Sequence, residues 1–198
     1  MKIETMNKQL ENEITIQKKM VDDLSKYESG EVVNDELPQL PNPKHLTEYM
    51  KEVLGDCRED LQVALCIIDL DHFKRYNDFH GCIEGNRCLQ QVRNCIKTIS
   101  SDRQGLLLHA DGNEFICFLT DISAAVFVQL GESLRDAVEQ LSLLFCWEQH
   151  AFQVTASVGG VHGLRGSFKD EAEMFSIAYE ELYKAKSNGR NNVKIKFQ

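Results

Sequence analysis

The sequence predicts an α+β domain built on a central, mostly antiparallel sheet. Short, continuous apolar runs, typical of buried strands, alternate with longer segments in which apolar residues recur at helical spacing. The Asp-Gly pair at 111–112, which lies between two apolar runs, is a strong signal for a β-hairpin. These observations predict the order β-α-β-β-α-β with additions, which is the ferredoxin-like arrangement with helices packed on one face of the sheet.

A helical pattern over residues 2–28 precedes this domain. Apolar residues form a stripe of helical period at Ile3, Met6, Leu10, Ile14, Met20, Val21, Leu24 and Tyr27. Two arrangements would cover this stripe: a parallel coiled coil that joins two copies, or docking onto the chain's own domain. We therefore expect an N-terminal helix within 1–34 and a folded domain over 35–198, with all three prolines in a rigid connector at 37–43.

Each element of the domain is predicted from its local pattern. Apolar runs bounded by turn residues predict strands at 62–70, 105–109, 114–119, around 145–150, 152–161 and 192–197. Amphipathic spacing predicts helices at 44–57, 83–100, 122–144 and 170–187. With 198 residues, 42% of them hydrophobic, the chain is long enough to bury a sizeable core between these elements.

Composition and charge argue against several classes of protein. The formal net charge is −9 and no Lys/Arg block occurs, so no nucleic-acid partner is expected. No apolar run approaches the ~20 residues of a membrane-spanning helix, and no signal-peptide core precedes the domain. None of the seven cysteines forms a CxxC pair, which favours buried thiols over zinc sites or disulfides. We expect a cytoplasmic protein that does not bind membranes.

Acidic residues lie where the first buried strand ends. Asp69 and Asp71 are two residues apart, so the strand period of two directs both carboxylates to the same side. Glu114 follows the turn of the predicted hairpin and adds a second acidic element. Carboxylates at strand ends can hold Mg²⁺ together with substrate phosphates. Solvated acids are also common at strand ends and turns, and spacing alone leaves both interpretations open.

Five motifs in this chain, taken in order, resemble those of one bacterial family. They are DELPQLPN at 35–42, IIDLDHFKRYND at 67–78, DGNEF at 111–115, VTASVGG at 154–160 and LYKAKSNGRNN at 182–192. Their counterparts are D-x-L-T-G-L-x-N, D-x-D-x-F-K-x-x-N-D, G-G-[D/E]-E-F, V-T-x-S-x-G and L-Y-x-A-K-x-x-G-R-N. Over about 160 residues the chain thus resembles the GGDEF domain family of diguanylate cyclases.

The resemblance implies a palm-type domain that condenses two GTP molecules into cyclic di-GMP, with two domains opposed and Mg²⁺ or Mn²⁺ bound with the nucleotide. The implied roles are metal binding by Asp69, the Leu70 carbonyl and Glu114, phosphate contacts by Lys74, Lys186 and Arg190, and substrate contacts by Asn77, Cys82 and Asn86. Read without the family, Lys186 and Arg190 are also typical of basic residues near the C-terminus of a helix.

The signature loop departs from the family pattern at two of its five residues. Gly112, Glu114 and Phe115 match the pattern, but Asn113 replaces a carboxylate that binds metal and acts as the base in the family. An amide brings no negative charge and cannot accept a proton as a carboxylate does. Asp111 replaces a glycine that lets the backbone approach the nucleotide, and its charge should repel a triphosphate. Both changes predict weakened catalysis.

Further departures affect base recognition and feedback. Asn86 replaces an aspartate that reads guanine in the family, Cys82 replaces a histidine, and His109 replaces the arginine before the signature. The inhibitory R-x-x-D motif is also missing, because residues 102–105 are Asp-Arg-Gln-Gly. We therefore expect no product-inhibition site, and selectivity for guanine is in doubt.

Three functions remain open from the sequence. The first is a degenerate domain that binds GTP or a related nucleotide, or docks a partner protein. The second is a working, slow diguanylate cyclase, and the third is a nucleotidyl cyclase of altered base specificity. In the first two, the N-terminal helix is expected to join a homodimer or to meet a partner protein.

Overall fold

The computed structural model describes residues 43–198, except residue 59, residues 101–103 and residue 111. Its helices are α2 (Pro43–Gly55), α3 (Phe73–His80), α4 (Cys82–Ser100), α5 (Ala124–Gln140) and α6 (Glu171–Ser187), with a 3₁₀ turn η1 (Arg165–Ser167). Its strands are β1 (Gln62–Asp71), β2 (Gly105–His109), β3 (Glu114–Thr120), β4 (Leu144–Trp147), β5 (His150–Gln153), β6 (Thr155–Leu164) and β7 (Val193–Phe197). The predicted N-terminal helix, the boundary at 34/35 and Asp111 lie outside the described residues and stay predictions.

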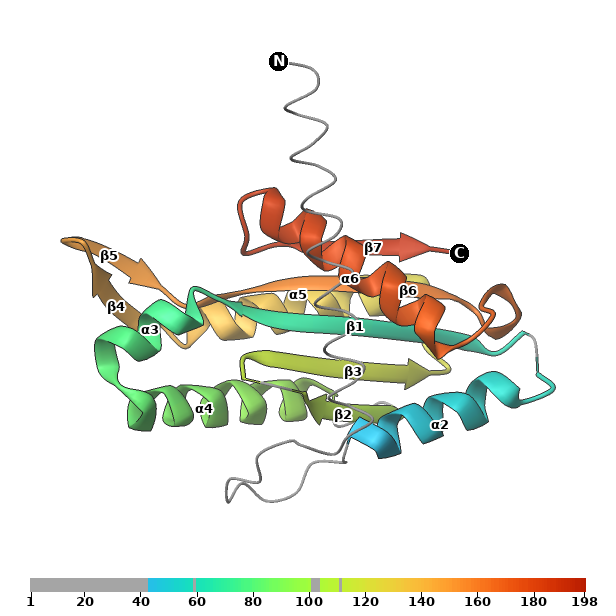
Figure 1. Ribbon diagram of the computed structural model, residues 1–198. Coiled ribbons are helices and arrows are strands. Elements are labelled where there is room, and N and C mark those ends of the chain that lie inside the picture. Colours follow the sequence, from blue (N-terminus) through green and yellow to red (C-terminus); the bar gives the residue numbers. More distant parts are fainter. Residues whose placement is uncertain (1–42, 59, 101–103, 111) are drawn as a thin grey trace, which may run out of the picture. The chain divides into compact units, whose positions relative to one another are not determined.

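Five strands form the central sheet in the order β2-β3-β1-β6-β7. Strand β1 pairs antiparallel with β3 and β6, and β3 pairs antiparallel with β2, whereas β7 runs parallel to β6. The prediction of an α+β domain with a mostly antiparallel central sheet is therefore confirmed. The remaining strands, β4 and β5, form a separate two-stranded hairpin that projects at one end of the domain (Figure 1).

Helices cover both faces of the sheet, so the prediction of helices on one face alone is wrong. Gly159 and Gly160 of β6 show this, because successive residues of a strand point to opposite faces. A Cβ atom at Gly159 would lie 2.1 Å from the backbone nitrogen of Leu182 in α6. A Cβ atom at Gly160 would instead lie 3.0 Å from the Phe127 ring in α5. Helices α5 and α6 therefore lie on opposite faces of β6.

The larger core lies between the sheet and helices α3, α4 and α5. From β1 it takes alternate residues, and α4 and α5 contribute apolar side chains at helical spacing; among them are Ala64, Cys66, Ile68, Leu70, Leu89, Val92, Ile96, Phe127, Leu130 and Leu134. The other face of β1, with Leu65 and Ile67, is equally buried. Burial on both faces explains why β1 is a continuous apolar run rather than an alternating one.

Three segments differ from their predicted bounds. Helix α3 was not predicted; it begins after His72, which turns the chain at a positive φ of 61°, and ends before Gly81 at φ 85°. Helix α5 starts later than the predicted 122 because the Ser123 hydroxyl caps its N-terminus by accepting from Val126 N–H, and it ends at Gln140 rather than at 144. The two strands expected at 145–150 and 152–161 are three, because the chain turns at Glu148 and Gln149, which have positive φ, and the strand is interrupted again at Val154.

Candidate functional site

Two carboxylates at the strand ends are cross-strand neighbours. Asp69 of β1 lies directly opposite Glu114 of β3 in the antiparallel register, and each residue is 5% exposed. Side chains in this position are close enough to interact, and two like charges there destabilise a sheet unless something compensates them. The structure thus brings together two of the residues that the sequence singles out.

Helix α6 supplies the groups that compensate these charges. Lys186 Nζ lies 2.7 Å from Asp69 Oδ2, and the Tyr179 hydroxyl donates to Glu114 Oε2 at 3.3 Å. Lys186 and Tyr179 are seven residues apart, which is about two helical turns, so they share one face of α6. Tyr179 is not among the site residues predicted from the sequence, although its spacing from Lys186 places the two on one helical face. The Lys186 side chain is 30% exposed, so its ammonium group can also meet a ligand.

Asn113 and Leu70 are joined by two hydrogen bonds across β3 and β1. The Leu70 N–H donates to the Asn113 main-chain carbonyl at 3.2 Å. In return, Asn113 Nδ2 donates to the Leu70 carbonyl oxygen at 3.0 Å. This oxygen is the one that the resemblance assigns to a metal ion. An amide N–H, which carries partial positive charge, lies against it in this protein.

The oxygen atoms at this site are poorly available to a divalent cation, because hydrogen-bond donors already occupy them. Mg²⁺ takes carboxylate and carbonyl oxygens as ligands. Here the Leu70 carbonyl accepts from an amide, one Asp69 oxygen meets an ammonium group, and one Glu114 oxygen accepts from a phenol. Among the residues that the structure describes, no three His, Cys, Asp or Glu side chains are grouped so as to hold a metal ion. A cation would have to displace donors that are already in place.

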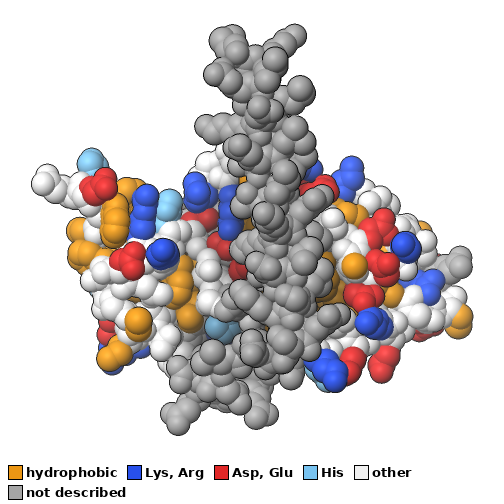
Figure 2. Space-filling model, in the orientation of Figure 1, with side chains coloured by type: hydrophobic (Ala, Val, Ile, Leu, Met, Phe, Trp, Pro, Cys, Tyr) orange, Lys and Arg blue, Asp and Glu red, His pale blue; other side chains and the backbone are white. Residues whose placement is uncertain are grey.

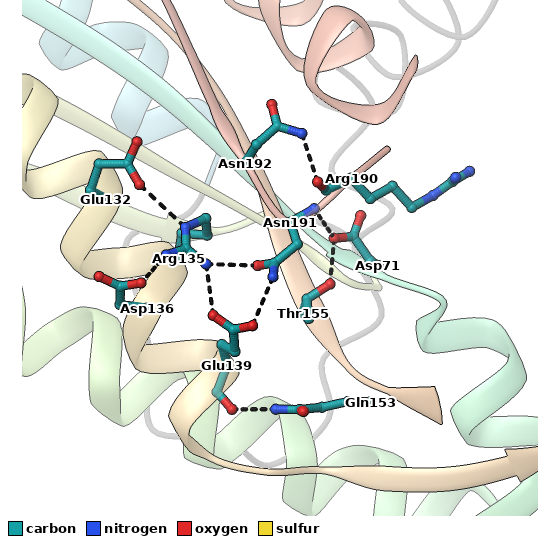
Figure 3. A network of polar contacts seen from close by, with 10 residues as sticks. All are labelled: Asp71, Glu132, Arg135, Asp136, Glu139, Gln153, Thr155, Arg190, Asn191 and Asn192. Atoms are coloured by element: carbon teal, nitrogen blue, oxygen red, sulfur yellow. Dashed lines mark hydrogen bonds and ion pairs between the residues drawn. The ribbon is translucent and has the colours of Figure 1, made fainter. Parts of the chain in front are cut away.

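Asp71 lies on the same side of β1 as Asp69 but has a different environment. It is 2% exposed and accepts from Thr155 Oγ1 at 2.7 Å, Ser157 Oγ at 2.8 Å and the Asn191 N–H at 3.0 Å. Figure 3 shows it beside Thr155 and the loop that follows α6. Its oxygens join β1 to β6 and to that loop. Asp71 is thus a structural residue, which its position two residues after Asp69 did not reveal.

The remaining predicted substrate residues lie on α3 and on the first turns of α4. Lys74, Cys82 and Asn86 are exposed, whereas Asn77 is half-buried. Asn77 Oδ1 is buried without a hydrogen-bond partner among the described residues. Its amide packs against Gly85, where a Cβ atom would lie only 1.7 Å from that oxygen. Gly85 therefore makes the space that Asn77 occupies, one residue before Asn86.

Charged groups of both signs gather around the end of β1. Burial, together with the nearby guanidinium groups of Arg190 and Arg75, lowers the pKa of His72 against the opposing effect of Asp71. The Arg75 guanidinium also lies 5.6 Å from the centre of the Trp147 ring. In Figure 2, basic, acidic and histidine side chains lie side by side over the region where Figure 1 places the end of β1 and the loop after α6. This mixture contrasts with the acidic charge of the whole chain.

His109 braces the signature hairpin at the position of the family's arginine. Its Nε2 atom lies 2.9 Å from the Gly112 carbonyl oxygen, and its ring stacks on Phe115 with centroids 4.6 Å apart. A shorter side chain thus holds the turn from within the hairpin. The sequence shows the replacement but contains no sign of this contact.

The cysteines only partly fulfil the prediction of buried thiols. Cys66, Cys88 and Cys117 are buried, but Cys57, Cys82 and Cys146 are exposed and Cys95 is intermediate. All seven are free thiols. Burial raises the pKa of Cys88 to about 12. The hydrogen bond with Cys117, together with burial, raises the pKa of Cys66. The three core thiols therefore act as small apolar side chains.

Comparison with curated proteins gives relatives along most of the chain. The chain is 30% identical over 171 residues to an uncharacterized membrane protein of Staphylococcus saprophyticus, covering 86% of the chain and 47% of that protein. It is 32% identical over 170 residues to diguanylate cyclase DgcP of Pseudomonas aeruginosa, covering 82% of the chain and 24% of that protein. The chain thus spans less than half the length of these relatives. In the part of the chain that the structure describes, no helix is long and apolar enough to cross a membrane.

Solved structures share the fold. The crystal structure of diguanylate cyclase SiaD of Pseudomonas aeruginosa with its activator SiaC matches with a TM-score of 0.69 at 25% identity, covering 98% of this chain and 75% of that one. The GGDEF domain of DgcB from Caulobacter crescentus, in complex with c-di-GMP, matches with a TM-score of 0.69 at 23% identity, covering 83% and 98%. The family model described as "Diguanylate cyclase, GGDEF domain" matches residues 32–192. The chain belongs to the GGDEF domain family.

Proposed function

We propose that this domain is a degenerate GGDEF domain that serves cyclic di-GMP signalling by binding a nucleotide rather than by synthesising the dinucleotide at a normal rate. GTP or a related nucleotide is the proposed ligand. The proposal depends on the chain's departures from the family pattern, and its support comes from the contacts that the replacing residues make.

The hydrogen bond from Asn113 Nδ2 to the Leu70 carbonyl is the observation that carries this proposal. A carboxylate at residue 113 could not donate this bond, because an ionised carboxylate only accepts. The replacement therefore removes a negative ligand and also places a donor against a second ligand oxygen. Loss of one preorganised group in an active site typically costs ~10²–10³ in rate. Two effects at one cation site support a larger loss.

Nucleotide binding is supported by groups that the Asn113 replacement leaves in place. Asn77 Oδ1 is a buried acceptor without a partner among the described residues, which is costly unless a ligand donates to it. Lys186 is part-exposed and Arg190 is exposed, so both can contact phosphate oxygens. These groups match the family positions for base and phosphate contacts.

A slow diguanylate cyclase is the second candidate function. It is favoured by the retained pair of Asp69 and Glu114, which stand opposite each other under Lys186. In that case Asp69 and Glu114 would hold Mg²⁺ or Mn²⁺ once their present donors are displaced, and the bound ion would supply charge stabilisation at the phosphates. The protein's own part is to position the two carboxylates and the lysine.

The decisive experiment restores the family residues and measures synthesis. The wild-type protein and an Asn113→Asp, Asp111→Gly variant are incubated with GTP and Mg²⁺ or Mn²⁺, and cyclic di-GMP is measured by chromatography. We expect the variant to be at least about 10²-fold faster than the wild type. Asn94→Asp, the same substitution at an exposed residue of α4, is the control and should change nothing.

Two results would decide between the candidates. Wild-type synthesis at a rate close to that of the variant, lost in Asp69→Ala or Glu114→Ala, would establish the slow cyclase and overturn the binding proposal. Without synthesis, a thermal-shift series with GTP, ATP and cyclic di-GMP measures binding, since stabilisation grows as RT ln(1 + [L]/Kd). No shift at millimolar nucleotide would reject nucleotide binding and leave docking of a partner protein.

A further inference from the structure

The loop between α6 and β7 has an unusual backbone. Gly189, Arg190 and Asn191 follow one another with φ values of 98°, 64° and 45°. Glycine takes this left-handed conformation freely, and asparagine tolerates it, but for other residues it costs roughly 1–2 kcal/mol. The Arg190 N–H donates to the Ala185 carbonyl at 3.2 Å, and its own carbonyl accepts from Asn192 Nδ2 at 2.7 Å. The contacts of the next residue, Asn191, add to these two bonds.

The side chain of Asn191 makes the contacts that hold this loop to α5. Its Nδ2 donates to Glu139 Oε1 at 2.9 Å, and its Oδ1 accepts from Arg135 Nη1 at 3.0 Å. Arg135 and Glu139 are themselves paired at 2.8 Å, one helical turn apart on α5. The main-chain N–H of Asn191 donates in addition to Asp71 (Figure 3). We call Arg135, Glu139 and Asn191 the clasp.

Only an amide side chain at residue 191 can bond to both Glu139 and Arg135. The Asn191 side chain must donate to a carboxylate and accept from a guanidinium group at the same time. An aspartate would repel Glu139, and a hydroxyl is too short to present both groups in one plane. Arg135 is also bound by Glu132 and Asp136 on its own helix, which leaves it little freedom to move. Arg135 and Glu139 therefore form a fixed contact surface for Asn191.

We propose that the clasp positions Arg190 for contact with the terminal phosphates of a bound nucleotide, so that Arg135, Glu139 and Asn191 are positioning residues of the site. This inference rests on the proposed nucleotide binding. Figure 3 shows the Arg190 guanidinium directed away from the clasp. The clasp thus holds the neighbouring residue, Asn191, and leaves the charged end of Arg190 for a ligand. Since α5 and α6 cover opposite faces of the sheet, the clasp also connects the far face to the site.

A comparison of GTP with GMP tests the clasp by calorimetry. In Asn191→Ala and in Glu139→Ala we expect GTP affinity to fall about tenfold, whereas GMP affinity changes less than about twofold. The reason is that only GTP has terminal phosphates for Arg190 to contact. In an Arg190→Ala background the same two substitutions should lower the GTP affinity almost no further. Asn188→Ala, three residues earlier in the same loop, is the matched control.

Each other outcome is informative. Equal losses for GTP and GMP, or a full additional loss in the Arg190→Ala background, would mean that the clasp serves general stability, and the inference would be wrong. If the wild type binds neither nucleotide, the proposed function fails, and amide hydrogen exchange then tests the clasp itself. Faster exchange at residues 190–192 in Asn191→Ala and Glu139→Ala, but not in Asn188→Ala, would show that the clasp orders the loop. Unchanged exchange in all three variants would overturn it.

Discussion

Asp69 and Asp71 are two residues apart on one side of β1, yet their surroundings assign them opposite roles. Asp69 stands opposite a second carboxylate and is compensated by Lys186, whose side chain can move toward solvent. Asp71 is enclosed by two hydroxyl groups of β6 and by a main-chain N–H of the loop between α6 and β7. A ligand can therefore replace the partner of Asp69, whereas the partners of Asp71 cannot leave without opening the fold. The local set of donors, and not the strand end, decides what each carboxylate does.

The largest expected effect comes from removing each aspartate in turn. Asp71→Ala leaves one buried donor, Ser157, and two part-buried donors without their acceptor, so we expect the free energy of unfolding to fall by about 3 kcal/mol. Asp69→Ala removes one of two opposed like charges and frees a part-exposed lysine, so the loss should be about 1 kcal/mol or less. Urea unfolding measures both values.

Asp78→Ala, at an exposed residue of α3, is the control and should leave stability almost unchanged. Equal losses for Asp69→Ala and Asp71→Ala would contradict the division of roles between the two residues. A larger loss for Asp69→Ala would reverse it.

This division could be predicted only in part from the sequence. The strand period placed both carboxylates on one side, and the motif pattern identified Asp69, Glu114 and Lys186, which the structure brings together. The donors to Asp71 come from residues 84, 86 and 120 positions away, so no local pattern could show them. The hydrogen bond from Asn113 to Leu70 was hidden for the same reason, since 43 residues separate the two.

The error about the faces of the sheet was avoidable. Two successive glycines, Gly159 and Gly160, interrupt an apolar strand, and glycine in a strand often marks a close approach of another element. Because neighbouring residues point to opposite faces, the pair indicates close packing on both. Helix α3 was missed for a different reason. Six of its eight residues belong to the 67–78 motif, and eight residues are too few for a clear helical period.

A smaller loss of stability is expected where α6 approaches the sheet. Gly159→Ala would place a Cβ atom 2.1 Å from the backbone of α6, which must then shift. Such overpacking costs roughly 1–3 kcal/mol, and we expect about 2 kcal/mol in urea unfolding. The shift of α6 also moves Lys186 and Tyr179, so the contacts of Asp69 should change more than the contacts of Asp71. Gly55→Ala, with open space around the new methyl group, is the control.

The smallest expected effect is a change in the titration of Glu139. Hydrogen bonds from Arg135 and Asn191 lower the pKa of this carboxyl below its usual 4.5. Since the folded state has the lower pKa, its contribution to stability is present above pH 4.5 and is lost as the pH falls through the lowered value. In Asn191→Ala one of the two donors is gone, so the pKa should rise toward 4.5, as carboxyl NMR titration would show. An unchanged pKa would mean that Asn191 does not contact Glu139 in solution, and the loop would then lack one of its two side-chain links to α5.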